Sequence, residues 1–125
     1  MTASAPHFPG RAPIHAYGNG GFRFADMSHR GSLLLLPSGI YGWAVTAPEE
    51  LTLDALAPVL AERENLEFLL LGTGATQVFP PSEIRRAFEN TGLGLEIMST
   101  GAAARTYNVL LAEKRAVAAA LMAVA

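Results

Sequence analysis

Residues 66–98 have the sequence LEFLLLGTGATQVFPPSEIRRAFENTGLGLEIM, which predicts a strand, a helix and a second strand in succession. The apolar run Leu66–Leu71, interrupted only by Glu67, predicts a strand that ends at Gly72. Pro80–Ser82 favours a helix start, and Gly92 suits the left-handed residue that follows a helix. Leu93–Met98 then alternates apolar residues with others, as strands do. This order predicts two parallel strands with the helix packed on their sheet.

The preceding part of the chain predicts antiparallel strands. Gly18–Gly21, with the sequence GNGG, lies between Ile14–Tyr17 and Phe22–Phe24. It indicates a hairpin, because Asn and Gly tolerate positive φ. The apolar run Leu33–Leu36 and the segment Ile40–Val45 are separated by Pro-Ser-Gly, which favours a turn between two further strands. A short buried helix over the first of these runs stays an alternative, because a short apolar pattern fits both.

Two further helices are expected on either side of the central unit. Thr52 is a suitable N-cap for a helix over about Leu53–Arg63, in which Pro58 predicts a kink or a start close to the proline. Thr100 is expected to cap a helical region that continues to about residue 122, with a bend near Glu113. The apolar residues of this region fall on one stripe at helical spacing.

Length and composition predict one domain. The chain has 125 residues, half of them apolar, which is enough for a core without disulfides or metals. Residues 1–13, in which Pro and Gly recur, are expected to form a flexible N-terminal arm. Residues 14–125 are expected to form a single α/β domain with a mixed sheet. Its antiparallel hairpin strands belong to the N-terminal half and its β-α-β-α succession to the C-terminal half.

Composition also excludes several function classes. The net charge of −2 argues against nucleic-acid binding, and the absence of cysteine excludes disulfides, thiolate nucleophiles and cysteine-ligated zinc. No apolar stretch approaches the roughly 20 residues of a membrane-spanning helix, although association with a membrane surface stays open. The adjacent basic residues Arg85 and Arg86 are expected to lie on a solvated helix face.

Catalytic and metal-binding patterns are not recognisable. His7, His15 and His29 have no metal-ligand spacing, and no serine lies in a Gly-x-Ser-x-Gly elbow. We therefore predict no catalytic residue, no metal site and no cofactor, and the sequence favours binding over turnover.

Gly72, Thr73 and Gly74 follow the strand with the longest apolar run, where ligands of open α/β folds gather. Their backbone N–H groups are candidates for contact with an anion. The segment lacks the Lys of a phosphate-binding loop and the third glycine of a dinucleotide fingerprint. A tight turn that uses the positive φ of glycine is the alternative interpretation.

Arg105, Thr106, Tyr107 and Asn108 follow the next strand end. If the two strands are neighbours, these residues face the glycine loop across a crevice. Arg105 would then bind a carboxylate or phosphate, oriented by Thr106 and Asn108. In the alternative, Arg105 pairs with a glutamate (Glu83 or Glu96) or a loop carbonyl, and Tyr107 belongs to the core.

Three segments carry a family resemblance: Leu71–Gly74, Pro81–Arg85 and Ala102–Leu110, which contains the Arg-Thr-Tyr-Asn run. They resemble a small conserved domain found in archaeal and bacterial proteins of unknown function, in the mitochondrial NADH dehydrogenase (complex I) assembly factor three, and in an adipogenesis-associated human protein. The similarity extends from about Ile14 to Met122.

The resemblance implies a three-layer α/β sandwich with a central mixed sheet. It implies no enzymatic activity or cofactor, and the mitochondrial branch acts by binding other assembly factors and subunits. The crevice between the glycine loop and Arg105–Asn108 would correspond to a suggestive crevice of the family. Many members have Cys where this chain has Ala104 and Asp where it has Ser99, so thiol chemistry in such members would not extend to this chain.

Two function hypotheses follow. The first is a non-catalytic protein-binding factor that assists assembly of a membrane complex, with protein partners, in the cytoplasm or peripheral at the inner membrane of a bacterium. The alternative is a small-molecule or anion-binding domain, or an unrecognised enzyme, that uses the crevice. The oligomeric state is not predicted.

Overall fold

The computed structural model describes residues 7–125. In this part of the chain, eight strands form a three-stranded and a five-stranded sheet, accompanied by three α-helices. The strands are β1 (Ala16–Gly18), β2 (Gly21–Phe24), β3 (Met27–Arg30), β4 (Ser32–Leu36), β5 (Gly39–Trp43), β6 (Phe68–Gly72), β7 (Gly94–Met98) and β8 (Val117–Leu121). The helices are α1 (Ala57–Ala61), α2 (Ser82–Thr91) and α3 (Thr100–Ala112), and 3₁₀ turns span Pro48–Glu50, Asp54–Leu56 and Arg63–Asn65.

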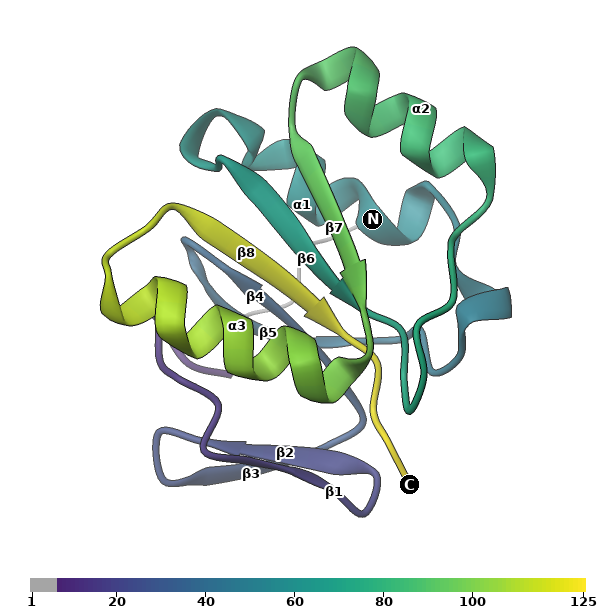
Figure 1. Ribbon diagram of the computed structural model, residues 1–125. Helices are drawn as coiled ribbons and strands as arrows, with labels where there is room; N and C mark the ends of the chain where they lie inside the picture. Colours follow the sequence, from purple (N-terminus) through teal and green to yellow (C-terminus); the bar gives the residue numbers. More distant parts are fainter. Residues whose placement is uncertain (1–6) are drawn as a thin grey trace.

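The five-stranded sheet is mixed, with the strand order β5-β4-β8-β6-β7. β6 pairs in parallel with β7 and β8, whereas β4 pairs antiparallel with β8 and β5. The chain moves outward from β6 through α2 to β7, and then back through α3 to β8 on the other side of β6 (Figure 1). Because such crossovers are right-handed, reversing the direction of travel places α2 and α3 on opposite faces of the sheet.

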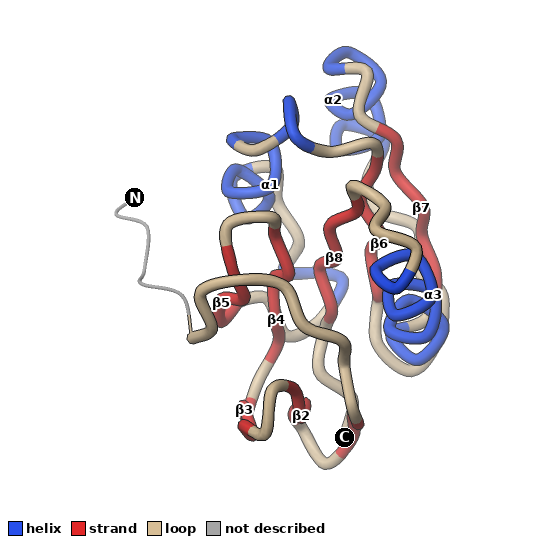
Figure 2. Tube along the Cα trace, turned by 90° about the vertical axis from the view of Figure 1, so that its left-hand side faces the viewer, coloured by secondary structure: helices blue, strands red, loops and turns tan. Residues whose placement is uncertain are grey.

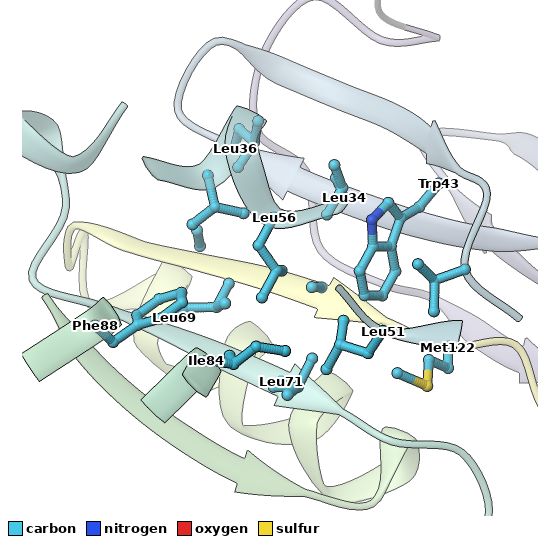
Figure 3. Packing of buried hydrophobic residues seen from close by; sticks show 14 of the residues in the cluster. Leu34, Leu36, Trp43, Leu51, Leu56, Leu69, Leu71, Ile84, Phe88 and Met122 are labelled. Atoms are coloured by element: carbon cyan, nitrogen blue, oxygen red, sulfur yellow. The ribbon is translucent and has the colours of Figure 1, made fainter. Parts of the chain in front are cut away.

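Three layers result from this arrangement, as the family resemblance implied. Figure 2 shows α1 and α2 above the large sheet, and α3 with the β2–β3 hairpin below it. Side chains alternate between the two faces along each strand: Leu34 and Leu36 face α1 and α2, whereas Leu33 and Leu35 face α3 and the small sheet. Figure 3 shows the first of these clusters, in which side chains of the sheet meet those of the helices; it includes Leu34, Leu36, Leu56, Leu69, Leu71, Ile84 and Phe88.

The predicted C-terminal helix is wrong beyond residue 112. α3 ends at Ala112, Lys114 turns the chain with a φ of 60°, and Val117–Leu121 forms the central strand β8. All five residues of β8 are buried between β4 and β6. A strand covered on both faces has a continuous apolar sequence, so it loses the alternation that distinguishes a strand from a helix.

The small sheet contains a strand that the sequence analysis missed. β3 follows β2 through Ala25 and Asp26, which have φ values of 49° and 60°. Two central residues with positive φ are typical of hairpin turns, but Ala-Asp lacks the glycine that usually signals one. The first predicted hairpin is confirmed, since β1 and β2 pair across Asn19 and Gly20.

The N-terminal segment is described from residue 7 onward, and the first helix differs from expectation. Residues 1–6 of the predicted arm lie outside the described residues, but the backbone of His7 and Phe8 bonds to Ile40 of β5. Ala12 is buried, so the apolar residues of this segment pack on the domain. The predicted helix over 53–63 is broken into 3₁₀ turns and the short α1, which begins next to Pro58 as the proline predicted.

Candidate functional site

The glycine loop after β6 packs directly on the first turn of α3. A Cβ on Gly72 would lie 2.9 Å from the Cα of Thr100, so a glycine is needed for this close approach. The Thr100 hydroxyl accepts a hydrogen bond from the Gly74 N–H (2.9 Å) and donates one to the Met122 carbonyl (2.7 Å). The Thr100 N–H in turn donates to the Gly74 carbonyl (2.8 Å). Thr100 therefore ties the ends of β6 and β8 to the start of α3.

The loop itself is closed by Thr73, whose side chain is buried. Its hydroxyl donates to the Thr76 carbonyl (2.7 Å), with the Met98 carbonyl as a longer alternative acceptor (3.3 Å), and it accepts from the Val78 N–H (2.9 Å). Gly74 has a φ of 98°, so the tight-turn interpretation of this glycine is correct. The hydroxyl of Thr73 is thus hydrogen-bonded to backbone groups of the same loop.

The residue that caps α3 is Ser99 and not Thr100. The Ser99 side chain accepts a hydrogen bond from the Ala102 N–H (3.3 Å). The sequence placed the cap one residue too late because serine and threonine are both good N-caps. Which of the two has the extended backbone of a cap depends on the loop contacts of Thr100.

Asn108 holds the N-terminal segment against α3. Its amide oxygen accepts from the Ile14 N–H (2.8 Å), and its amide nitrogen donates to the Ile14 carbonyl (2.7 Å). Tyr107 lies in the core between α3 and the sheet, where burial raises the pKa of its hydroxyl and the nearby Arg11 side chain opposes that rise. The core interpretation of Tyr107 is therefore correct.

Arg105 and Thr106 lie on other sides of the helix. The Thr106 hydroxyl donates to the Ala102 carbonyl one turn earlier (2.8 Å). Arg105 is exposed, and its Nη1 atom would lie 3.4 Å from a Cβ on Gly101, which the hydroxyl of Tyr17 covers directly. Successive residues of a helix are separated by about 100°, so the four residues from 105 to 108 do not present one common surface.

The predicted ion-pair partners of Arg105 are not observed. Among residues 7–125 the ion pair joins Arg115 to Glu67 at 3.0 Å, between two half-exposed side chains. That pair, together with a bond from the Ala116 N–H, lowers the pKa of Glu67. The structure thus brings the glycine loop to Thr100, with Arg105 between one and two turns further along α3.

The structure also contains a groove that the sequence analysis did not identify. It has a volume of about 360 Å³ and lies between α2 and the outermost strand β7. Its α2 side consists of Ser82, Arg85, Arg86 and Glu89, and its apolar side of Phe88, Leu93, Leu95 and Ile97. The sequence features that could have pointed to the groove were the Arg85-Arg86 pair and the alternation of apolar residues along 93–98. They did not indicate a groove because the strand's place at the sheet edge depends on β8.

Three further features of the described residues bear on function. Within residues 7–125, no three His, Asp or Glu side chains gather as metal ligands. No helix in the same range is long and apolar enough to cross a membrane. Exposed apolar side chains include Val78 and Phe79 in the loop before α2, and Phe79 is 64% exposed.

Residues 14–122 match the family model described as "Protein of unknown function (DUF498/DUF598)". The chain belongs to this family. It is 39% identical over 122 residues to an uncharacterised protein of Rhodobacter capsulatus, covering 98% of this chain and 93% of that protein. It is 30% identical over 109 residues to the NADH dehydrogenase [ubiquinone] 1 alpha subcomplex assembly factor 3 of Danio rerio. That match covers 87% of this chain but 63% of the assembly factor, so the chain spans less than two thirds of its length.

A similar solved structure supports the fold. The crystal structure of a protein of Bartonella henselae, titled an outer membrane protein, superimposes with a TM-score of 0.91 and 57% sequence identity. The match covers 95% of this chain and 100% of that chain. The family resemblance and the α/β fold class predicted from the sequence are both confirmed.

Proposed function

We propose that this protein is a non-catalytic protein-binding factor that assists the assembly of a membrane complex, specifically a respiratory NADH dehydrogenase. The observation that carries the proposal is the similarity to assembly factor 3 over 87% of this chain. Because the match covers nearly all of the described domain, the domain itself is the shared part on which an assembly role would rest. The proposal puts the protein in the cytoplasm, at the surface of the inner membrane.

The contacts of the predicted crevice also support binding over turnover. Thr73 and Asn108 of the predicted crevice, and Thr100 beside it, use their polar side-chain atoms in hydrogen bonds to backbone groups of the chain. Tyr107 is buried in the core. General acid–base or nucleophilic catalysis needs a polar side chain within reach of a substrate, and these four side chains serve the fold instead.

Affinity capture tests the proposal. A tagged full-length chain, expressed in its own organism at native level, is recovered from detergent-solubilised membranes and its companions are identified. We expect subunits of one membrane complex, or another assembly factor, well above the level recovered with the same tag on an unrelated protein of similar size. Recovery at the level of that control contradicts the proposal.

A deletion strain provides an independent measurement. Native gel electrophoresis of its membranes is expected to show less assembled NADH dehydrogenase, with free subunits accumulating, and the wild-type gene is expected to restore assembly. An unchanged amount of assembled complex, with capture at the control level, would exclude an assembly role.

A second candidate function is anion binding at Arg105, favoured by the exposure of that guanidinium beside Gly101 and the Tyr17 hydroxyl. A panel of anionic metabolites tests it by thermal shift. A ligand at 100 times its dissociation constant would stabilise the fold by about 2.7 kcal/mol. Arg105→Ala should abolish that shift without lowering the melting temperature of the free protein. If no metabolite shifts the wild-type protein, this function is excluded.

A further inference from the structure

The two edges of the large sheet differ in their backbone pairing. At the β5 edge, the backbone of residues 7 and 8 bonds to Ile40 and pairs with the strand at that residue. At the opposite edge, β7 pairs on one side only, with β6 (Figure 1). No backbone segment within residues 7–125 pairs with its outer side. An unpaired edge strand is a ready template for a further strand unless charge, proline or a bulge blocks it.

The outward-facing groups of β7 follow from its register with β6. The Gly94 N–H and the Met98 carbonyl bond towards the β6 side, at 3.2 and 3.0 Å. Backbone groups of alternate residues point to opposite edges of a strand, so those of Leu95 and Ile97 point outward. The Gln77 side chain donates to the Ile97 carbonyl (2.8 Å), which leaves the two N–H groups and the Leu95 carbonyl for a partner.

The groove beside this edge would receive the side chains of an added strand. Leu95 and Ile97 direct their half-buried side chains towards the α2 layer, where they line the groove. The helix of a β-α-β unit runs antiparallel to its strands, so Arg85 and Arg86 lie beside the middle of β7 and Glu89 beside its start. The groove therefore combines an apolar strip with two cationic groups at mid-strand and one carboxylate, that of Glu89, near the start of the strand.

The charge of the groove identifies the chemistry of its occupant. Arg85 and Arg86 are exposed and take part in no ion pair within residues 7–125. A second copy pairing edge to edge about a two-fold axis would bring its own α2 arginine pair close to these two, and the like charges would repel each other. An acidic segment would instead supply carboxylates that guanidinium groups bind in a bidentate manner.

We propose that the outer edge of β7 binds an extended segment of a partner protein as an added strand. Aliphatic side chains of that segment lie on Leu95 and Ile97, and a carboxylate next to them binds Arg85 or Arg86. Main-chain hydrogen bonds supply affinity, and the alternate side chains supply specificity, as in other cases of strand addition. This inference rests on the proposed function in that the partner is a protein, and it assigns the surface and the type of segment recognised.

A phage-displayed library of random peptides of about 12 residues, long enough to span the strand, probes the edge directly. The full-length protein is the target, and selected peptides are synthesised and titrated. We expect them to alternate aliphatic residues with Asp or Glu. NMR amide exchange should show the Leu95 and Ile97 N–H groups protected by the peptide.

The double variant Arg85→Glu/Arg86→Glu should weaken peptide binding by about tenfold or more, because it places like charges opposite the acidic segment. The matched control is Arg23→Glu/Arg30→Glu, which makes the same change of charge at two exposed arginines of the small sheet. The control should bind the peptides as the wild-type protein does. The NMR spectrum of each variant shows that it is folded.

Three results would overturn the assignment: peptides whose affinity does not depend on Arg85 and Arg86, protection at amides away from β7, or a concentration-dependent dimer that the double variant abolishes. Affinity capture with the same variants separates this inference from the proposed function. Capture of the same partners by the wild type and the Arg85/Arg86 variant keeps the assembly role and rejects the β7 edge. Loss of partners in the Arg85/Arg86 variant, with capture retained by the wild type and the control variant, supports both the assembly role and binding at the β7 edge. If the wild-type protein captures partners only at the background level, the assembly role is rejected, and the peptide measurements then test binding at the β7 edge.

Discussion

Replacing Asn108 with alanine removes two hydrogen bonds, at 2.7 and 2.8 Å, that hold the backbone of Ile14 against α3. Each such bond contributes about 0.5 to 1.5 kcal/mol net, so their joint loss should lower the free energy of unfolding by about 1 to 3 kcal/mol. The better helix propensity of alanine offsets about 0.5 kcal/mol of this. At an m-value of about 1.5 kcal/mol/M, the net loss of about 0.5 to 2.5 kcal/mol lowers the urea midpoint by about 0.3 to 1.7 M.

Asn90→Ala is the matched control, because Asn90 is an exposed helical asparagine of α2. Urea denaturation monitored by circular dichroism gives both midpoints, and amide exchange of the Ile14 N–H reports whether the segment is released. We expect a large decrease and faster exchange for Asn108→Ala alone. Midpoints for the two variants within about 0.3 M of each other, or unchanged exchange at Ile14, would refute the structural role of Asn108.

Three further perturbations test other parts of the structure. Gly72→Ala places a Cβ 2.9 Å from the Cα of Thr100, and should destabilise by about 1 to 3 kcal/mol in urea denaturation; a change below 0.5 kcal/mol, roughly the scatter of neutral surface substitutions, would contradict the close packing. Ala119→Leu overpacks the fully buried centre of β8. The variant should either fail to fold, and so show no cooperative transition in urea, or lose about 3 kcal/mol of its free energy of unfolding. An unchanged free energy of unfolding would be incompatible with a central strand. The pKa of His29 is lowered below 6.5, first by burial and then by the charge of His7. The ring centroids of the two histidines lie 4.8 Å apart. The unfolded chain therefore binds more protons there, so the free energy of unfolding should be highest above about pH 6.5 and fall towards pH 5, with a shallower fall in His29→Gln; equal slopes in the two proteins would contradict this.

The part of the fold best predicted from sequence is the β6–α2–β7 unit. Its elements are punctuated by residues with strong local effects: Pro81 precedes α2, and Gly92 ends it with a φ of 74°. These residues restrict the backbone whatever surrounds them, so their effect is visible in the sequence alone. The turn at Ala25 and Asp26 shows the opposite case, because positive φ at these residues has no local sequence signal.

The candidate site was predicted in part. The expectation that the glycine loop meets the start of α3 depended on β6 and β7 being neighbours, and they pair over their whole length. How Tyr107 and Asn108 are used could not be predicted, because it depends on which sides of α3 face the sheet and the N-terminal segment. The groove beside Arg85 and Arg86 was missed for a similar reason: the sequence shows two exposed arginines, and the sheet order alone places them at an open edge.

By itself the sequence determined the α/β fold class and a β-α-β unit whose start and stop signals are local. Only the tertiary structure decided where the C-terminal residues go. Apolar residues at helical spacing predicted a helical region that continues to about residue 122, and alanine, which fills much of 116–120, itself favours a helix by a few tenths of a kcal/mol per residue. The gap between β4 and β6 instead takes a strand whose backbone pairs on both sides and whose five side chains are all buried. Burial on both faces and a complete ladder outweigh that preference, and both arise from neighbours distant in the sequence.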